Sequence, residues 1–169
     1  MKIARWALGG LGIVFLILQF IRPDRTAGPA NTEQSIAALY HVDEEVSGIL
    51  RKACFDCHSN DTRYPWYTEV QPVGWYLQGH IDEARKHLNF DEFGSYPLFR
   101  QMSKLQAVED EVRDELMPLD EYLPLHPEAR LTPEERESII AWSRSVRDSM
   151  RAWYPADSLQ RRRRTSRSE

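Results

Sequence analysis

Apolar residues recur at helical spacing along most of the chain. One stripe predicts a helix over residues 43–53, where Asp43 has the side chain and the position of an N-cap. Two more stripes predict helices over residues 74–88 and 98–116. The three stripes consist of Val46, Ile49 and Leu50; of Leu77, Ile81, Ala84 and Leu88; and of Met102, Leu105, Val108 and Val112. They predict an all-α body, with Met102 as a core residue.

The start of the last helix is marked by a capping box. Thr132 is followed by Pro133, which favours the first helical position, and by Glu135 three residues after the cap. Apolar residues from Ile139 to Met150 then continue the pattern. We expect three to five helices in the body, with the helix from Thr132 packed across the helix of residues 43–53 near the functional site.

The N-terminal region contains an almost unbroken apolar run from Trp6 to Ile21, with basic residues on both sides. A helix of this length spans about 24 Å, which is less than the roughly 30 Å hydrocarbon core of a bilayer. The run fits either a short membrane anchor or the apolar region of a signal peptide. We favour the anchor, because only Gly28-Pro29-Ala30 offers small residues for a cleavage site.

These patterns divide the chain into four parts. Residues 1–25 form the anchor or signal segment, 26–40 a linker, 41–155 a single domain and 156–169 a basic tail without apolar pattern that we expect to be disordered. The net charge is -4, yet both ends are basic, so the domain itself is acidic. An acidic domain predicts no nucleic-acid partner; its surface either attracts basic partners or is simply well solvated.

The most informative stretch is Cys54-Phe55-Asp56-Cys57-His58. Cys-x-x-Cys-His is the sequence form of a c-type haem attachment site. On one helical turn, residues i, i+3 and i+4 share a face, so Cys54, Cys57 and His58 point the same way. The two sulfurs can then form thioethers with the vinyl groups of one haem, and His58 can serve as the proximal iron ligand.

Two other interpretations of the two cysteines stay open. A redox-active pair normally opens the helix of a βαβ unit, and the sequence near residue 54 has no strand pattern. A zinc site needs a second pair of ligands, but Cys54 and Cys57 are the only cysteines in the chain. The other histidines also lack zinc-finger spacing; they are His41, His80, His87 and His126.

A second iron ligand is predicted at Met117. Pro118 disfavours helical backbone at the residue before it, which leaves the Met117 thioether on a loop about sixty residues after His58. His80 and His126 are alternative ligands. An open sixth position, with His80 or Arg63 as a distal polar group, would instead fit a gas sensor or a peroxidase-like protein.

The segment that follows the motif is rich in aromatic residues and proline. Arg63, Trp66 and Tyr67, together with Trp75, are candidate hydrogen-bond donors to haem propionates, or else ordinary core and surface residues. The carbonyl of Pro65 or of Pro72 is expected to orient the His58 ring, because metal-bound histidines usually need such a partner.

Taken together, the sequence resembles the bacterial haem-binding domain proteins of the cytochrome c type. The similarity spans about residues 40–150 and is carried by Cys54 to Tyr67, Gln71 to Val73, His87 to Phe90, Met117 to Leu119, His126-Pro127 and Leu131-Thr132. The resemblance implies an all-helical domain with one covalent haem c and its iron. It assigns the thioethers to Cys54 and Cys57, proximal ligation to His58 and, with less support, distal ligation to Met117.

The resemblance also implies a cellular role. We expect a non-enzymatic electron-transfer protein in the periplasm, held at the bacterial inner membrane by its N-terminal helix or released after cleavage. Its expected partners are redox proteins of the cell envelope.

Overall fold

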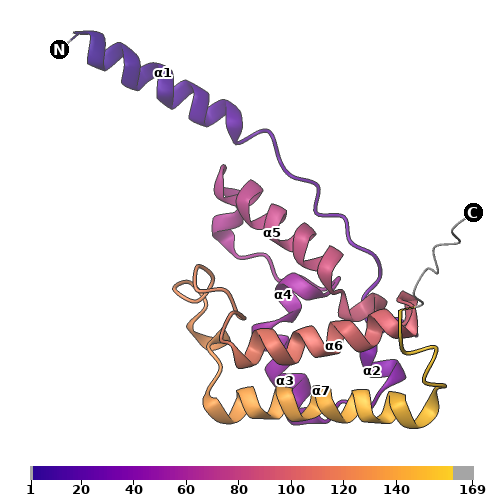
Figure 1. Cartoon of the computed structure of the whole chain (residues 1–169). Helices are drawn as coiled ribbons and strands as arrows, with labels where there is room; N and C mark the ends of the chain where they lie inside the picture. The colour runs from indigo at the N-terminus through magenta and orange to yellow at the C-terminus, as the bar shows by residue number, and fades with distance from the viewer. Residues whose placement is uncertain (1, 162–169) are drawn as a thin grey trace, which may run out of the picture.

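The computed structural model describes residues 2–161, and these form seven α-helices, three short 3-10 helices and no strand (Figure 1). The all-α prediction is therefore confirmed. The α-helices are α1 (Lys2–Leu18), α2 (Ile36–Leu39), α3 (Glu44–Ala53), α4 (Phe55–His58), α5 (Val73–His87), α6 (Leu98–Arg113) and α7 (Pro133–Trp153). The 3-10 helices are η1 (Trp66–Glu69), η2 (Phe90–Ser95) and η3 (Pro127–Ala129).

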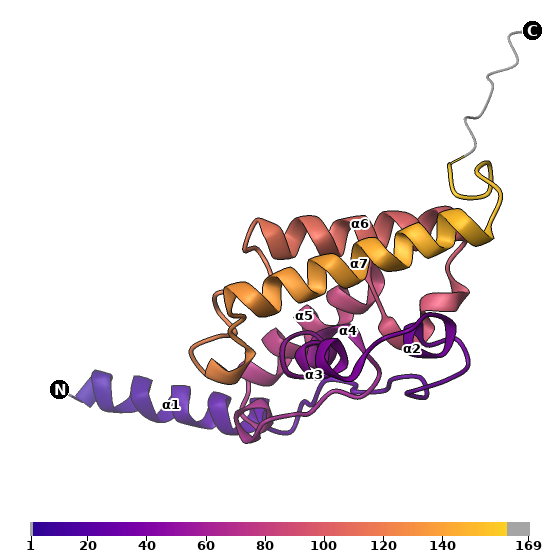
Figure 2. The same ribbon diagram turned by 90° about the horizontal axis from the view of Figure 1, so that it is seen from below.

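The two longest helices of the body, α6 and α7, lie antiparallel and side by side in both ribbon views (Figures 1 and 2). The helix α3 packs on α7, as predicted, and α4 continues from α3 toward α5. The helix α1 projects away from the body, to which an extended segment connects it (Figure 1). Among residues 2–161, four helices after α1 have ten or more residues, which agrees with the three to five expected, while α2 and α4 are additional single turns.

The predicted apolar stripes form the core. The main cluster joins α3, α6 and α7 through Leu50, Leu105 and Met150, all of which are fully buried. A smaller cluster joins the same helices near Ile49 and Ile139. Met102 packs against the main cluster from its edge, in agreement with its expected packing role.

The predicted helix starts are confirmed and one predicted end is not. Asp43 accepts a hydrogen bond from the Val46 amide at 2.8 Å, and the capping box of Thr132 is complete. The helix α6 ends at Arg113 rather than near Leu116. The helix ends early because Glu115 adopts a left-handed φ of 59°, which is incompatible with α-helix and precedes Pro118 in the chain.

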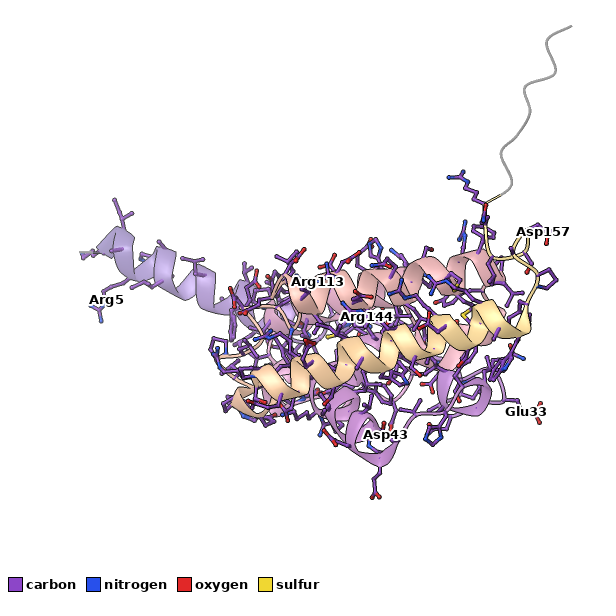
Figure 3. The ribbon with its side chains drawn as sticks, turned by 60° about the horizontal axis from the view of Figure 1, so that its bottom comes forward. Arg5, Glu33, Asp43, Arg113, Arg144 and Asp157 are labelled. Carbon is purple, nitrogen blue, oxygen red and sulfur yellow. The ribbon has the colours of Figure 1, made fainter. Side chains whose placement is uncertain are left out.

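A cluster of charged side chains joins α6 to α7. The buried carboxylate of Glu109 accepts hydrogen bonds from Arg113, Arg144 and Arg147. Figure 3 shows Arg113 and Arg144 reaching this region from the two helices. The hydrogen bonds from Arg144, together with the three positive charges, hold the pKa of Glu109 below its usual value of 4.5.

The domain extends beyond both of its expected boundaries, because residues before position 41 and after position 155 pack against its core. Ile36 and Tyr40 are buried in the main core cluster, so the last part of the expected linker packs with the domain. Leu159 also packs against that cluster. The expected disordered tail lies largely at residues 162–169, which are outside the described residues.

The helix α1 exposes its apolar side chains. All of its residues are exposed or half-buried, and its side chains include Trp6, Leu11 and Phe15. Between residues 2 and 161, no helix combines the length and the hydropathy that crossing a membrane requires. The expectation of a transmembrane anchor is thus not supported by the structure.

Candidate functional site

The Cys-x-x-Cys-His motif lies where α3 meets α4. Cys54 ends α3 and precedes the single turn of α4. Its carbonyl accepts hydrogen bonds from the Cys57 amide at 3.2 Å and from the His58 amide at 2.9 Å. The motif is therefore wound into one tight turn, in line with the helical geometry inferred from its spacing.

Two adjoining cavities of about 210 and 440 Å³ lie beside this turn. Both are lined by Cys54, His58 and Met117, and Cys57 and Tyr67 line the smaller one. The remaining walls come mainly from α5, α6 and the loop after α6, and they are chiefly apolar; they include Leu77, Ala84, Val108, Leu119 and Leu125. A large flat apolar ligand that bears a metal matches such a lining.

The ring of His58 is held by the end of α5. Its Nδ1 donates to the carbonyl oxygen of Leu88 at 2.9 Å, which leaves Nε2 as the nitrogen available to a metal. The orienting carbonyl is thus neither Pro65 nor Pro72, as the sequence suggested. The reason is that α5 ends at His87, so the carbonyls of its last turn and of Leu88 lack helical partners. Burial lowers the pKa of His58, which favours the neutral imidazole that metals bind.

The two thiols are free and half-buried. Burial raises the pKa of Cys54 to about 12 and that of Cys57 to about 11. Reactive redox cysteines have lowered pKa values, so this environment disfavours a thiol oxidoreductase. Among the described residues, no group of three or more His, Cys, Asp or Glu side chains is arranged to hold a metal ion.

The carboxylate of Asp56 connects the motif to two distant segments. Its oxygens accept from the Arg63 amide at 3.1 Å and from Arg63 Nε and Nη2 at 3.0 Å each. It also accepts from the Tyr122 hydroxyl at 2.9 Å. Tyr122 belongs to the same loop as Met117 and lines the smaller cavity, so Asp56 ties that loop to α4. Burial and the Asp56 charge raise the pKa of Tyr122, which keeps its hydroxyl protonated as a donor.

A second polar pair lies beside Tyr122. The Tyr67 hydroxyl and His126 Nε2 are 2.5 Å apart, and the His126 ring stacks on Tyr122 with their centroids 3.9 Å apart. His126 does not line the two cavities. Its position therefore gives no support to iron ligation by His126.

The predicted site residues divide into two groups. The structure brings Cys54, Cys57, His58, Met117 and Tyr67 to the cavities, and His80 lies there as well. Arg63 and Trp66 do not line either cavity, because Arg63 is engaged by Asp56 and Trp66 is 80 % exposed.

Trp75, another candidate donor to the haem propionates, also lines neither cavity. Its Nε1 donates to the Ile21 carbonyl at 2.8 Å. None of these contacts tests propionate binding, which stays a prediction.

Helix α7 packs on α3 as expected, but among the described residues it contributes none to the cavity walls. Those walls come mainly from α5, α6 and the loop after α6. Sequence reasoning also missed Leu88, Asp56 and Tyr122. Only Asp56 carried a signal, since it lies inside the motif.

Comparison with known families gives one match. The family model described as haem-binding domain matches residues 13–145, which is most of the chain. Comparisons with curated proteins and with solved structures gave no match. The matched region contains the whole motif, both cavities and the Met117 loop. On this match, the chain belongs to the haem-binding domain family.

Proposed function

We propose that this protein is a c-type cytochrome that transfers single electrons. Cys54 and Cys57 hold one haem through thioethers, His58 is its proximal ligand and Met117 its distal ligand. The observation that carries the proposal is that all four side chains line the smaller apolar cavity, and three of them also line the adjoining one. The chain belongs to a haem-binding family, and two thiols lie beside His58. This combination supports covalent attachment of the haem through both sulfurs.

The chain's own residues fit such a group. Leu88 fixes the His58 ring, and Asp56 and Tyr122 tie the loop of Met117 to the turn of the motif. The apolar walls exclude water and stabilise the less charged state of the site. The haem supplies an iron that accepts and releases one electron, and methionine ligation together with burial favours a high reduction potential. The protein thus has to hold ligands and exclude solvent rather than perform a reaction.

The proposed location is the periplasmic side of the bacterial inner membrane. The support is the helix α1, whose exposed apolar side chains need a lipid, a signal-recognition partner or another apolar surface. Haem attachment through cysteines, in the resemblance described above, also belongs to exported proteins. Redox proteins of the cell envelope are the proposed partners.

A second candidate is a five-coordinate haem protein that binds small ligands. One observation favours it: His80 lines both cavities and offers them a polar side chain. However, His80 Nδ1 is bonded to the Tyr76 carbonyl at 3.0 Å and its ring packs on Tyr76. The two candidates differ in whether Met117 occupies the sixth position.

Absorption spectra of the haem-loaded full chain test this difference. We compare the protein with Met117→Leu and with Met102→Leu, a matched control in which the methionine lies outside the cavities. For electron transfer we expect a c-type spectrum in all three proteins, and a weak sulfur-to-iron band that only Met117→Leu loses. We also expect carbon monoxide to bind readily to that variant alone.

Two results would contradict the proposal. A preparation without covalent haem would remove the c-type assignment. A covalent haem that binds carbon monoxide equally well in the parent and in Met117→Leu would exclude Met117 as ligand and favour the small-ligand binder.

A further inference from the structure

A third cavity, of about 870 Å³, lies away from the motif. It is formed by the first half of α6, the last half of α7 and the segment that follows α7. The two helices run side by side at this end of the body (Figures 1 and 2). Lys104 is its one lining residue that also lines a cavity of the haem site, so the two sites are separate but adjoin.

The walls of this cavity are strongly basic. Within residues 2–161, these walls contain no carboxylate and carry five basic residues, namely Arg100, Lys104, Arg147, Arg151 and Arg161. Arg147 pairs with Glu109, and Arg151 pairs with Asp148 at 2.6 Å. Between residues 2 and 161, no carboxylate lies within ion-pair distance of Arg100 or Lys104. The cavity therefore holds positive charge that the rest of the described protein does not neutralise.

The position of Lys104 is fixed by its neighbours. Its ammonium group lies 4.2 Å from the centre of the Tyr96 ring and donates to the His87 carbonyl. Burial, followed by the charge of Arg100, lowers the pKa of Lys104. Arg100 and Lys104 carry like charges in one cavity and repel each other, and a bound anion would relieve that repulsion.

The base of the cavity contains a buried guanidinium. The Arg147 side chain is only 10 % exposed, and its Nη1 and Nη2 groups donate to Gln106 and Glu109. Its Nε–H is also buried and has no acceptor among the described residues. Buried donors usually find a partner, so this guanidinium keeps hydrogen-bonding capacity that the described chain does not use.

We propose that this cavity binds a phosphate group, with Arg100 and Lys104 as the contacting residues and Arg147 as a further positive charge in its wall. Arginine suits this role because its planar guanidinium binds two phosphate oxygens at once. Phe99, Met102 and Leu159 give the same cavity an apolar side on which the remainder of the ligand can pack. The phosphate can belong to a soluble compound or to a phospholipid headgroup.

Binding measurements on the haem-loaded full chain test the proposal. The probes are inorganic pyrophosphate, measured by titration calorimetry, and phosphatidylglycerol vesicles, measured by co-sedimentation. The test variant is Arg100→Gln with Lys104→Gln. The matched control is Arg51→Gln with Arg130→Gln, which removes the same charge at two exposed positions outside the cavity. The arginines at positions 161–164 are present in every protein, so they cannot account for a difference. An unchanged far-UV circular dichroism spectrum verifies that each variant is folded.

We expect the test variant to bind at least one probe at least tenfold more weakly than the parent, while the control binds within about twofold, since one lost charge-assisted bond alone is worth about a factor of ten. A selective loss of pyrophosphate binding identifies a soluble phosphate ligand. A selective loss of vesicle binding identifies a lipid headgroup. An equal loss in the test and control variants, or no binding of either probe by the parent, would overturn the proposal.

Discussion

At the residue scale, Asp56 does more than occupy a variable position between two cysteines. Its carboxylate accepts three hydrogen bonds from Arg63 and one from Tyr122, which lies 66 residues further along the chain. Replacement by asparagine removes the charge and turns one acceptor into a donor that faces other donors. The turn of the motif and the Met117 loop should both loosen.

We predict that Asp56→Asn lowers the free energy of unfolding by about 2 kcal/mol, a typical loss for hydrogen bonds to a partly buried charge. Denaturant unfolding of the haem-loaded protein measures it. Asp61→Asn is the control, because Asp61 is exposed and its side chain makes no hydrogen bond to another described residue. Equal stabilities of the two variants would show that the Asp56 network is not important for folding.

The residues of the site differ in how far sequence could reveal them. Cys54, Cys57 and His58 are close in sequence, so one turn of helix suffices to predict that they share a face. Leu88 could not be found in this way, because it acts through a backbone carbonyl that every residue has. Tyr122 could not be found because its partner is distant in sequence. Their contributions depend on tertiary packing, which no local pattern encodes.

At the scale of elements, the contact between η1 and α5 depends on one glycine. A Cβ atom at Gly74 would lie 2.3 Å from the Thr68 carbonyl oxygen, so any side chain there must push η1 and α5 apart. Gly79, one turn further along α5, has no such neighbour within 4 Å. The same substitution should therefore have opposite effects at the two positions.

We predict that Gly74→Ala destabilises the protein by about 2 kcal/mol through overpacking. Gly79→Ala should stabilise it by about 0.5–1 kcal/mol, because alanine favours the helix. Thermal or denaturant unfolding of the pair provides the comparison. A stabilising Gly74→Ala would mean that η1 does not pack on α5 as closely as described.

The contact between α6 and α7 predicts a response to acid. The pKa of Glu109 is lowered by folding, so its contribution to stability is complete above its usual value of 4.5 and is lost as the pH falls through the folded-state pKa. Glu109→Gln should cost about 3 kcal/mol at neutral pH, because it leaves buried Arg147 without its carboxylate.

Unfolding measured between about pH 7 and pH 3 tests this, since the stability of Glu109→Gln should fall less steeply with acid than that of the parent. The control Glu137→Gln changes an exposed carboxylate and should retain the parent's pH profile. Parallel profiles for the parent and Glu109→Gln would assign the acid sensitivity to other carboxylates.

Helix starts were predictable, whereas helix ends and neighbours were less so. Asp43 and Thr132 are local capping signals, and both begin the helices expected from them. The end of α6 depends instead on the backbone of Glu115, which no proline rule identifies. That α5 and α6, and not α7, line the cavities reflects how the apolar stripes of several helices share one core. Periodicity gives the apolar face of each helix but not its partner.

At the scale of the whole molecule, α1 stands apart from the body. None of its residues is buried, and the contacts that attach the N-terminal segment begin after it, with Gln19, Arg25 and the Ile21 carbonyl. The stability of the body should therefore not depend on α1.

We predict that deleting residues 2–18 changes the melting temperature of the haem-loaded protein by less than about 2 °C, since it removes no buried contact. The same deletion should move the protein from the detergent phase to the aqueous phase in a detergent-partition assay, because it removes the exposed apolar side chains. A large fall in melting temperature would show that α1 contributes to the fold.

The hydrogen bond from His58 Nδ1 to the Leu88 carbonyl offers a way to engineer the site. The ring that would hold the iron is steered by the last carbonyls of α5, a helix that begins at Val73 and has its own packing on η1. A designer who wishes to adjust the reduction potential in small steps can leave every ligand in place and alter α5 instead. Lengthening or shortening its final turn would move Leu88, tilt the imidazole and change its electron donation. The length of α5 would then adjust the reduction potential of the cofactor.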